Sequence, residues 1–386
     1  MDKIELIATC NFGVESVLKE EIINLGYDIR KVEDGRITFM TDVRGIAMAN
    51  IWLRTAERIH LKMGEFRATS FEELFQNIKK IEWEKWIKKS SIFPVKKAVS
   101  IKSRLHSTPD VQAITKKAIV ERLKLIYKVE WLEETGEEYP IYVFINKNDV
   151  TVTIDTSGDS LYKRGYKERQ SEASIKETLA SLMVMLTPWR AERELIDPFC
   201  GAGTILIEAA MIGLNIAPGL NRKFPFENWE QIDKEDLKLI KKQAFNGIKN
   251  TLDFKLQGYD IDEDVLKIAR ENAENAGVSD YIHFQKRDMR EISSNKKYGF
   301  IITNPPYGER MEDIPTVEAL YKDMGKAFKK LDTWSFYIIT SYEEFEKKFG
   351  KRADKKRKLY NGMIKTNLYK FRGPKPPRKT DKDKNM

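Results

Sequence analysis

The chain has 386 residues, of which 41% are hydrophobic and 33% are charged, a balance typical of a globular protein with more than one domain. Its first residues lack the apolar core of a signal peptide and no apolar run is long enough to cross a membrane, so we expect a cytoplasmic protein with no membrane partner. The two cysteines, Cys10 and Cys200, are too few for a disulfide framework or a structural zinc site, and no metal is expected.

The formal net charge of +9 is concentrated at one end of the chain. Residues 351–386 contain 14 Lys or Arg and 3 Asp, a local charge of +11, which leaves about −2 for the other residues. A basic end of this kind suits a polyanionic partner such as nucleic acid, although a solubilising segment would look the same. Residues 373–386, rich in Pro and Lys and poor in apolar residues, are expected to form a disordered basic tail.

The first 160 residues are predicted to form short α+β elements. Alternation of apolar and polar residues indicates the strands, and helical periodicity indicates the helices. One helix is expected to close at Gly26, and another to begin at Thr108 with Pro109 in its first turn. The predicted strands are 3–10, 37–43, 96–105 and two within 141–158, and the predicted helices are 14–26, 71–87 and 108–127.

From about Tyr162 the pattern changes to strands that alternate with helices. A connector and an amphipathic helix come first, and the strands that follow are mostly apolar. This pattern predicts the α/β class, with a doubly wound, mostly parallel sheet. The predicted strands are 192–199, 255–262, 281–288, 298–306 and 334–341, and the predicted helices are one within 163–186 and those at 204–213, 263–277 and 316–331.

Ligands of such sheets bind beyond the carboxyl ends of the strands, near the point where the strand order reverses. The first strand end is DPFCGAGT, in which Gly201 and Gly203 would let a ligand approach the backbone where a helix opens at Thr204. The third glycine of a dinucleotide motif and the Lys-Ser/Thr pair of a P-loop are absent, so those two interpretations are weak. A turn of this kind also occurs as a plain connection between a strand and a helix.

Three further strand ends carry residues that suit a ligand. Asp260 could accept both hydroxyls of a ribose, although it could also cap the following helix, for which Asp262 is better placed. Asp288 could accept from an adenine amino group, although a single acid at such a position is more often an ordinary surface residue. The last strand end is Asn304-Pro305-Pro306-Tyr307. Together the four strand ends indicate a ligand site more strongly than any one of them does, because they follow one another in one series of strands and helices.

In this order the motifs resemble those of the class I S-adenosylmethionine-dependent methyltransferases, over residues 165–386. The resemblance implies a Rossmann-like, seven-stranded domain with S-adenosylmethionine as its cofactor. It places the methionine part of the cofactor at Asp197 and the glycine turn, the ribose at Asp260 and the adenine at Asp288. The residues that it assigns to the cofactor are Lys176, Glu177, Asp197, Pro198, Cys200, Gly201, Gly203, Thr204, Asp260, Ile261, Asp288, Met289 and Asn304.

The motif at Asn304 matches the signature of the enzymes that methylate exocyclic amino groups, such as adenine N6, cytosine N4 or guanine N2. Such an amine is a poor nucleophile because its lone pair is delocalised into the ring. If its N–H groups donate to the Asn304 side-chain oxygen and the Pro305 carbonyl, the lone pair can turn toward the methyl group. The prolines restrict the backbone, and Tyr307 would offer a stacking face for a flipped base. The expected catalytic residues are Asn304, Pro305, Pro306 and Tyr307, whereas Cys200 is expected to be a packing residue rather than a nucleophile.

A wider set of stretches resembles the bacterial 23S ribosomal RNA guanine-N2 methyltransferase family, whose catalytic domain follows a ferredoxin-like segment and a THUMP RNA-binding domain. In the catalytic part the stretches are NPPYGER, DPFCGAGTILIEAA, APGLNRKFPFENW and RGYKERQ. In the THUMP part they are VSIKSRLHSTPDVQAITKKAIVERLK and VFINKNDVTVTIDTSG. The implied domains are ferredoxin-like at 1–60, THUMP at 61–160 and methyltransferase at 161–372, before the tail at 373–386. The implied reaction is methylation of guanine N2, with 23S rRNA as the expected partner.

Three alternatives stay open. The tRNA guanine-N2 methyltransferases with THUMP domains compete, because bifunctional members of the rRNA family carry a second methyltransferase domain for which this chain is too short. A DNA adenine-N6 methyltransferase would use the same motif, although the THUMP-like region argues against it. A non-catalytic RNA-binding protein would not need the intact set of motif residues. Cations of the N-terminal region would contact RNA phosphates or form a solvated face: Lys96, Lys97, Lys102, Arg104, Lys116, Lys117 and Arg122.

Overall fold

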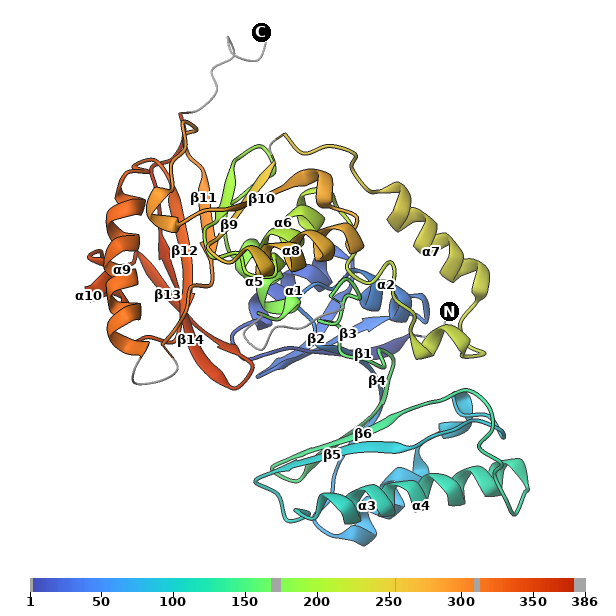
Figure 1. The fold of residues 1–386 in the computed structure, drawn as a ribbon. Coiled ribbons are helices and arrows are strands. Elements are labelled where there is room, and N and C mark those ends of the chain that lie inside the picture. The colour runs from blue at the N-terminus through green and yellow to red at the C-terminus, as the bar shows by residue number, and fades with distance from the viewer. Residues whose placement is uncertain (1–2, 168–174, 254, 309–312, 378–386) are drawn as a thin grey trace. The chain divides into compact units, whose positions relative to one another are not determined.

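The computed structural model describes residues 3–167, 175–253, 255–308 and 313–377. The chain divides into two compact units, whose elements are labelled in Figure 1. Unit 1 comprises residues 1–10, 18–161 and 218–246, and unit 2 comprises residues 11–17, 162–217 and 247–386. Most of the expected tail at 373–386 lies outside the described residues, which end at Pro377.

Unit 1 is built on one seven-stranded sheet with the strand order β2-β3-β1-β4-β7-β6-β5. Neighbouring strands are antiparallel, except that β5 and β6 are parallel. The elements are β1 (Ile4–Thr9), α1 (Glu15–Asn24), β2 (Asp28–Glu33), β3 (Arg36–Thr41), α2 (Arg44–Trp52), β4 (Arg58–Arg67), α3 (Phe71–Lys80), β5 (Val95–Ile101), α4 (Thr108–Tyr127), β6 (Ile141–Asn146), β7 (Asp149–Asp155) and α7 (Lys234–Asn246).

Strand β4 joins the two halves of this sheet. It pairs with β1 through residues 58–61 and with β7 through residues 60–67, with a bulge between Lys62 and Gly64. The sequence pattern did not predict β4, because the bulge interrupts its alternation, nor β2, which is largely exposed and charged. The expected boundary between residues 60 and 61 falls inside β4, so the regions on either side of it share one sheet.

Residues 218–246 lie within the expected methyltransferase boundaries but pack in unit 1. The backbone N–H of Gly219 donates to the Ile51 carbonyl at 2.9 Å, and the two backbones lie so close that a Cβ at Gly219 would clash. The ring of Trp229 stacks on that of Tyr139, with 4.5 Å between the centroids. Contacts of this stretch, which contains all of APGLNRKFPFENW except its first residue, therefore hold it to the N-terminal part of the chain.

Unit 2 holds a second seven-stranded sheet, with the strand order β10-β9-β8-β11-β12-β14-β13. The strands from β10 to β12 are parallel, whereas β14 and β13 are antiparallel to their neighbours. The strand order reverses between β8 and β11, and the expected doubly wound, mostly parallel sheet is confirmed. The elements are α5 (Glu177–Met185), β8 (Leu195–Asp197), α6 (Thr204–Gly213), β9 (Leu256–Asp260), α8 (Glu263–Asn275), β10 (Ile282–Lys286), β11 (Phe300–Thr303), α9 (Ile314–Lys329), β12 (Ser335–Thr340), α10 (Phe345–Phe349), β13 (Lys355–Asn361) and β14 (Ile364–Phe371).

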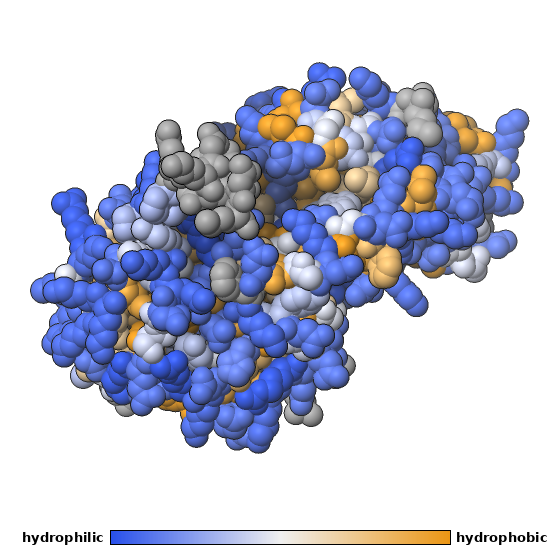
Figure 2. Space-filling model, turned by 90° about the horizontal axis from the view of Figure 1, so that it is seen from above, coloured by the Kyte–Doolittle hydropathy of each residue, from blue (hydrophilic) through white to orange (hydrophobic). Residues whose placement is uncertain are grey.

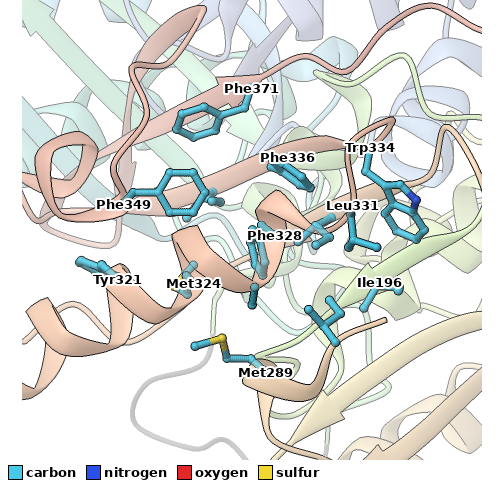
Figure 3. Close-up of a cluster of buried hydrophobic side chains, with 14 of the residues drawn as sticks. Ile196, Met289, Tyr321, Met324, Phe328, Leu331, Trp334, Phe336, Phe349 and Phe371 are labelled. Carbon is cyan, nitrogen blue, oxygen red and sulfur yellow. The ribbon is translucent and has the colours of Figure 1, made fainter. Parts of the chain in front are cut away.

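Helices cover both faces of the second sheet (Figure 1). On one face, α6 and α8 contact β9 and β10. On the other, α9 and α10 close over a cluster of buried side chains, in which Phe328 packs on Phe336 and Phe349 packs on Phe371 (Figure 3). Burial of each such ring stabilises the fold by about 1.5 to 3 kcal/mol, so the strands are held in a rigid frame.

Strands β13 and β14 form a hairpin where the sequence indicated only a basic end. β13, with the sequence KKRKLYN, is an edge strand that exposes most of its charged residues. Edge strands often carry such charges, which discourage pairing with other chains. The charges also mask the alternation of apolar and polar residues from which a strand is predicted. The cations of residues 355–371 therefore belong to a folded element.

The face of the molecule in Figure 2 is mainly hydrophilic, with hydrophobic residues in small groups. Large apolar side chains with high exposure include Phe12, Trp131 and Met363. Within the described ranges, no helix combines the length and the apolar character that a membrane crossing requires.

Candidate active site

The residues singled out at strand ends lie at one edge of the second sheet. Asp197 is the last residue of β8 and Asp260 is the last residue of β9. Asp288 follows β10 by two residues, and Asn304 directly follows β11. Because these four strands are parallel, their carboxyl ends share one edge, next to the point where the strand order reverses.

The glycine turn after β8 leaves room beside its backbone. Gly201 and Gly203 have positive φ angles of 48° and 80°. A Cβ added at Gly201 would meet nothing within 4 Å, whereas one at Gly203 would lie 2.9 Å from the Phe284 ring. Gly203 therefore serves packing, and Gly201 faces open space. The buried Asn272 side chain donates to the Ala202 carbonyl at 3.0 Å and supports the turn, a role that the sequence gave no reason to expect.

Asp197 is buried at the start of this turn, with 1% of its surface exposed. Its Oδ1 accepts a bond of 2.6 Å from the Thr303 hydroxyl and one of 3.2 Å from the Phe199 N–H. Burial raises the pKa of the carboxyl from 3.8 to about 7, the two hydrogen bonds oppose this rise, and the charge of Asp260 adds to it. Such a carboxyl is poised to ionise when a cation arrives.

The Asp260 carboxylate is held by two backbone amides. Its Oδ2 accepts from Gly201 at 3.0 Å and its Oδ1 accepts from Asp262 at 3.1 Å. The cap of α8 is Asp262, whose side chain accepts from the Asp264 N–H, so Asp260 is not needed for that purpose. The next residue, Ile261, is 67% exposed and offers an apolar surface beside the carboxylate.

Asp288 already has partners. It caps the short 3₁₀ helix Met289–Glu291 by accepting from the Arg290 N–H, and it forms an ion pair of 2.8 Å with the Arg290 guanidinium. The guanidinium also pairs with Asp323 at 3.0 Å. The side chain of Met289 is buried in the core cluster, so a ligand at this edge would meet the backbone of Met289 rather than its side chain.

The stretch after β11 is braced from within unit 2. The Tyr321 hydroxyl donates to the Pro306 carbonyl at 2.7 Å and lies 2.9 Å from the Thr340 hydroxyl. The Tyr307 hydroxyl donates to the Asn304 side-chain oxygen. The ring of Tyr307 is buried, so it does not present the open stacking face that the sequence led us to expect. The oxygen expected to accept from an amine is thus occupied by a neighbouring hydroxyl.

A buried charged network lies behind the site, and the sequence prediction missed its centre, Glu208 of α6. Glu208 is fully buried and accepts from the hydroxyls of Tyr166 and Ser181, with the Arg164 guanidinium at 3.6 Å. Burial with the nearby carboxylates keeps the pKa of Tyr166 well above its usual value. The available signal was the one charged residue in the otherwise apolar helix TILIEAAMIG.

The expected pair Lys176 and Glu177 lies at the start of α5. The Lys176 ammonium is 4.6 Å from the centroid of the Tyr162 ring. Glu177 is buried and pairs with Lys167 at 3.3 Å; burial raises the pKa of Glu177 and the lysine opposes that rise. These contacts fix the connector from residue 162 to residue 167 on the same unit as the strand ends.

The remaining expected residues surround the glycine turn. Pro198 and Cys200 are buried, and Thr204 is the first residue of α6. Burial raises the pKa of the Cys200 thiol well above its ordinary value, so the thiol stays protonated. This agrees with a packing role.

Three domain profiles match the chain. The RlmL ferredoxin-like domain matches residues 5–60, the THUMP domain matches residues 68–155, and the RMKL-like methyltransferase domain matches residues 164–370. The three matches follow one another without overlap and together take in both units.

Two relatives are similar over most of the chain. YpsC of Bacillus subtilis (strain 168), provisionally named an RNA methyltransferase, is 46% identical over 96% of both chains. The ribosomal RNA large subunit methyltransferase K/L of Marinomonas sp. (strain MWYL1) is 31% identical over 94% of this chain. The match spans 52% of the length of the Marinomonas protein.

Two solved structures share the whole architecture. SMU.472, provisionally named a methyltransferase and solved with SAH, is 43% identical, covers 98% of this chain and 100% of its own, and has a TM-score of 0.93. A predicted N6-adenine-specific DNA methylase from Listeria monocytogenes str. 4b F2365 is 45% identical, covers 97% of each chain and has a TM-score of 0.92.

Proposed function

The chain belongs to the family of RMKL-like methyltransferases, and on that premise we propose that it transfers a methyl group from S-adenosylmethionine to the exocyclic N2 of a guanine in RNA, with 23S rRNA as the substrate. The observation that carries the proposal is the meeting of Asp197, Gly201, Asp260 and Asn304 at one edge of the sheet. We further propose the domain order ferredoxin-like, THUMP and methyltransferase, with residues 218–246 as an insertion that packs on the first two.

The residues of this edge fit S-adenosylmethionine. The buried Asp197 carboxyl suits the cofactor's ammonium, and the open backbone at Gly201 lets the methionine part lie close. Asp260, preset by two amides, suits the ribose hydroxyls, and the exposed side chain of Ile261 suits one face of the adenine. When bound, the cofactor supplies a methyl group that is already activated on a sulfonium, so no nucleophilic side chain is required.

The chain's own contribution is to position and polarise the amine. The Asn304 oxygen and the Pro305 carbonyl would accept its two N–H groups, with the amine displacing the Tyr307 hydroxyl from Asn304. Tyr321, whose hydroxyl stays protonated because burial raises its pKa, holds the Pro306 carbonyl and so fixes the stretch. Positioning of this kind can supply roughly 7 to 11 kcal/mol of the barrier reduction.

The seven cations of the N-terminal region that were expected to contact RNA fall into two groups. Lys96 pairs with Glu138, Lys116 with Glu134 and Arg122 with Glu84, so these three serve the fold. The other four cations form no ion pair with any residue in the described ranges and would be available to phosphates: Lys97, Lys102, Arg104 and Lys117.

Adenine N6 in DNA is the second candidate, because Asn304 and Pro305 would serve that amine equally well and one similar structure carries that name. The test is to incubate the protein with labelled S-adenosylmethionine and, separately, 23S rRNA, tRNA and duplex DNA, and then to analyse the nucleosides. We expect the label in N2-methylguanosine from 23S rRNA. Label in N6-methyladenine, or in DNA alone, would overturn the proposal, and label in tRNA alone would correct the substrate.

A further inference from the structure

We propose that the β13–β14 hairpin is a second RNA-binding surface, in which Tyr360 and Phe12 stack an unpaired base while Lys358 and Lys365 bind the neighbouring phosphates. We call these four residues the hairpin surface. The inference rests on the proposed function, because it takes RNA as the substrate. The hairpin surface would be an RNA-binding site within unit 2, beside residues 304–307, which would accept the amine.

Strand pairing puts the hairpin at the active-site edge of the sheet. Thr340, the last residue of β12, pairs with Asn367 of β14. Lys365 lies two residues beyond that pair, about 7 Å past the end of β12 at roughly 3.3 Å per residue. The Thr340 hydroxyl is itself 2.9 Å from the Tyr321 hydroxyl, which donates to the Pro306 carbonyl. The hairpin therefore projects next to the stretch that would accept the amine.

The register of the hairpin places the proposed residues on one face. Tyr360 pairs with Lys365, and Lys358 pairs with Asn367, so these side chains share the side of the sheet that Tyr369 also faces. Tyr369 is buried in the core cluster, but the face becomes open farther along the hairpin, where Lys358 and Lys365 are exposed. The side of the second sheet that faces the core at Tyr369 is therefore exposed to solvent near the tip of the hairpin.

Two aromatic rings lie on this open end. Phe12 is 57% exposed and meets the Tyr360 ring edge-on, with 6.4 Å between the centroids. The Lys358 ammonium is 5.4 Å from the centroid of Tyr360. Phe12 is exposed and Tyr360 is half-buried, so both rings reach the surface beside cations. Single-stranded nucleic acids bind to such surfaces, since any base can stack on a ring while its phosphates contact the charges.

The charge of the hairpin matches a polyanion. Residues 355–372 contain no Asp or Glu and seven cations: Lys355, Lys356, Arg357, Lys358, Lys365, Lys370 and Arg372. Some of these cations serve the fold, because Lys356 pairs with Glu346 and Arg357 donates to the Gly13 carbonyl and to the Ser16 hydroxyl. Lys358 and Lys365 form no ion pair within the described part of the chain, which leaves their charge to a partner.

The contact of Arg357 with Gly13 also explains why Phe12 belongs to the surface. A Cβ at Gly13 would lie 2.8 Å from the Lys358 carbonyl oxygen, so the backbone of this loop lies directly against β13. The bonds from Arg357 hold it there and keep Phe12 beside Tyr360. The surface is thus assembled from two segments that are about 340 residues apart in the sequence.

The test uses the full chain and a fluorescein-labelled single-stranded RNA of mixed sequence, with affinity measured over a range of salt concentrations. We expect K358A/K365A to weaken binding about tenfold and to reduce the slope of log affinity against log salt by about 1.4, since each phosphate contact to a single strand contributes roughly 0.7. Tyr360→Ala should weaken binding about tenfold with little change in slope, whereas Tyr360→Phe should bind normally.

The matched control is K329A/K330A, which removes the same charge from the same unit. These exposed lysines end α9 and precede β12, and so lie at the opposite edge of the sheet. Thermal unfolding and binding of S-adenosylhomocysteine check that each variant is folded. RNA binding and methylation of 23S rRNA that are unchanged in K358A/K365A and Tyr360→Ala would overturn the hairpin surface but leave the proposed function intact. A parent protein that methylates DNA alone would instead refute the proposed function.

Discussion

The hydroxyl of Thr303 donates a hydrogen bond of 2.6 Å to Asp197, and it thereby joins the last residue of β11 to the last residue of β8. These two strands flank the point where the strand order reverses. The acid expected to hold the cofactor and the strand that delivers Asn304 are therefore one connected structure. A shift of either strand would change both the cofactor site and the amine site.

Cofactor affinity should depend on pH through Asp197. Its pKa of about 7 in the free protein means that the carboxyl is mostly protonated below pH 7, while an ammonium group binds the carboxylate. Binding of S-adenosylhomocysteine should therefore weaken about tenfold for each pH unit below 7 and level off above it. Calorimetric titration across this range measures the profile. Asp197→Asn should abolish the slope, Thr303→Val should move its midpoint upward, and a flat profile in the unaltered protein would refute the role of Asp197.

Asn304→Ala should separate cofactor binding from turnover. The side-chain oxygen that polarises the amine is lost, while the contacts of Asp197, Gly201 and Asp260 are not touched. We expect kcat to fall about 10² to 10³-fold, as for other preorganised polar groups, with unchanged affinity for S-adenosylhomocysteine. Asn304→Asp keeps an acceptor and should retain more activity than Asn304→Ala. Normal turnover of Asn304→Ala would show that the amine is activated elsewhere.

Tyr307→Phe should make the amine site easier to occupy. The variant keeps the buried ring and removes the hydroxyl that donates to Asn304. Since a typical hydrogen bond contributes about 0.5 to 1.5 kcal/mol net, KM for the RNA should fall about 2 to 10-fold while kcat changes little. Steady-state kinetics with 23S rRNA measure both constants. A higher KM would mean that the hydroxyl binds the substrate instead.

Glu208→Ala should destabilise the protein strongly, because it removes the buried carboxylate that accepts from Tyr166 and Ser181 and lies 3.6 Å from the Arg164 guanidinium. Breaking a buried ion pair at one end costs about 3 to 5 kcal/mol. Differential scanning calorimetry should show a lower unfolding temperature for unit 2. The control is Glu271→Ala, which removes an exposed carboxylate from α8 of the same unit and should have little effect. A similar loss in both variants would argue against the network.

The sequence was most informative where burial and backbone geometry constrain it. The strands β8, β9 and β11 are short and mostly apolar, so Asp197, Asp260 and Asn304 stand out at their ends. Contacts between distant segments leave no such pattern. The link from Arg357 to Gly13 could not be predicted from spacing, because it depends on how two distant segments pack. The hydrogen bond from the Tyr307 hydroxyl to Asn304 is local, but it depends on the backbone path of the Pro-Pro stretch, which the sequence pattern does not specify.

Strands that are exposed or irregular also could not be predicted from the sequence pattern. β13 carries charges on both faces, and the bulge in β4 shifts its register after Lys62, so neither follows a period of two. The insertion at 218–246 was assigned by its position in the chain. Its contacts with Ile51 and Tyr139 became visible only in three dimensions.

Strand β4 has a practical consequence for dissecting the protein. A fragment that begins at residue 61 would cut this strand and remove its pairing with β1. A fragment that ends at residue 60 would keep residues 58–60 of β4 beside β1 but lose the rest of the strand, together with its pairing to β7. Either piece would expose unpaired backbone along a sheet edge, which promotes aggregation. The first 161 residues should therefore be produced together, with residues 218–246 present, if RNA recognition is to be studied apart from catalysis.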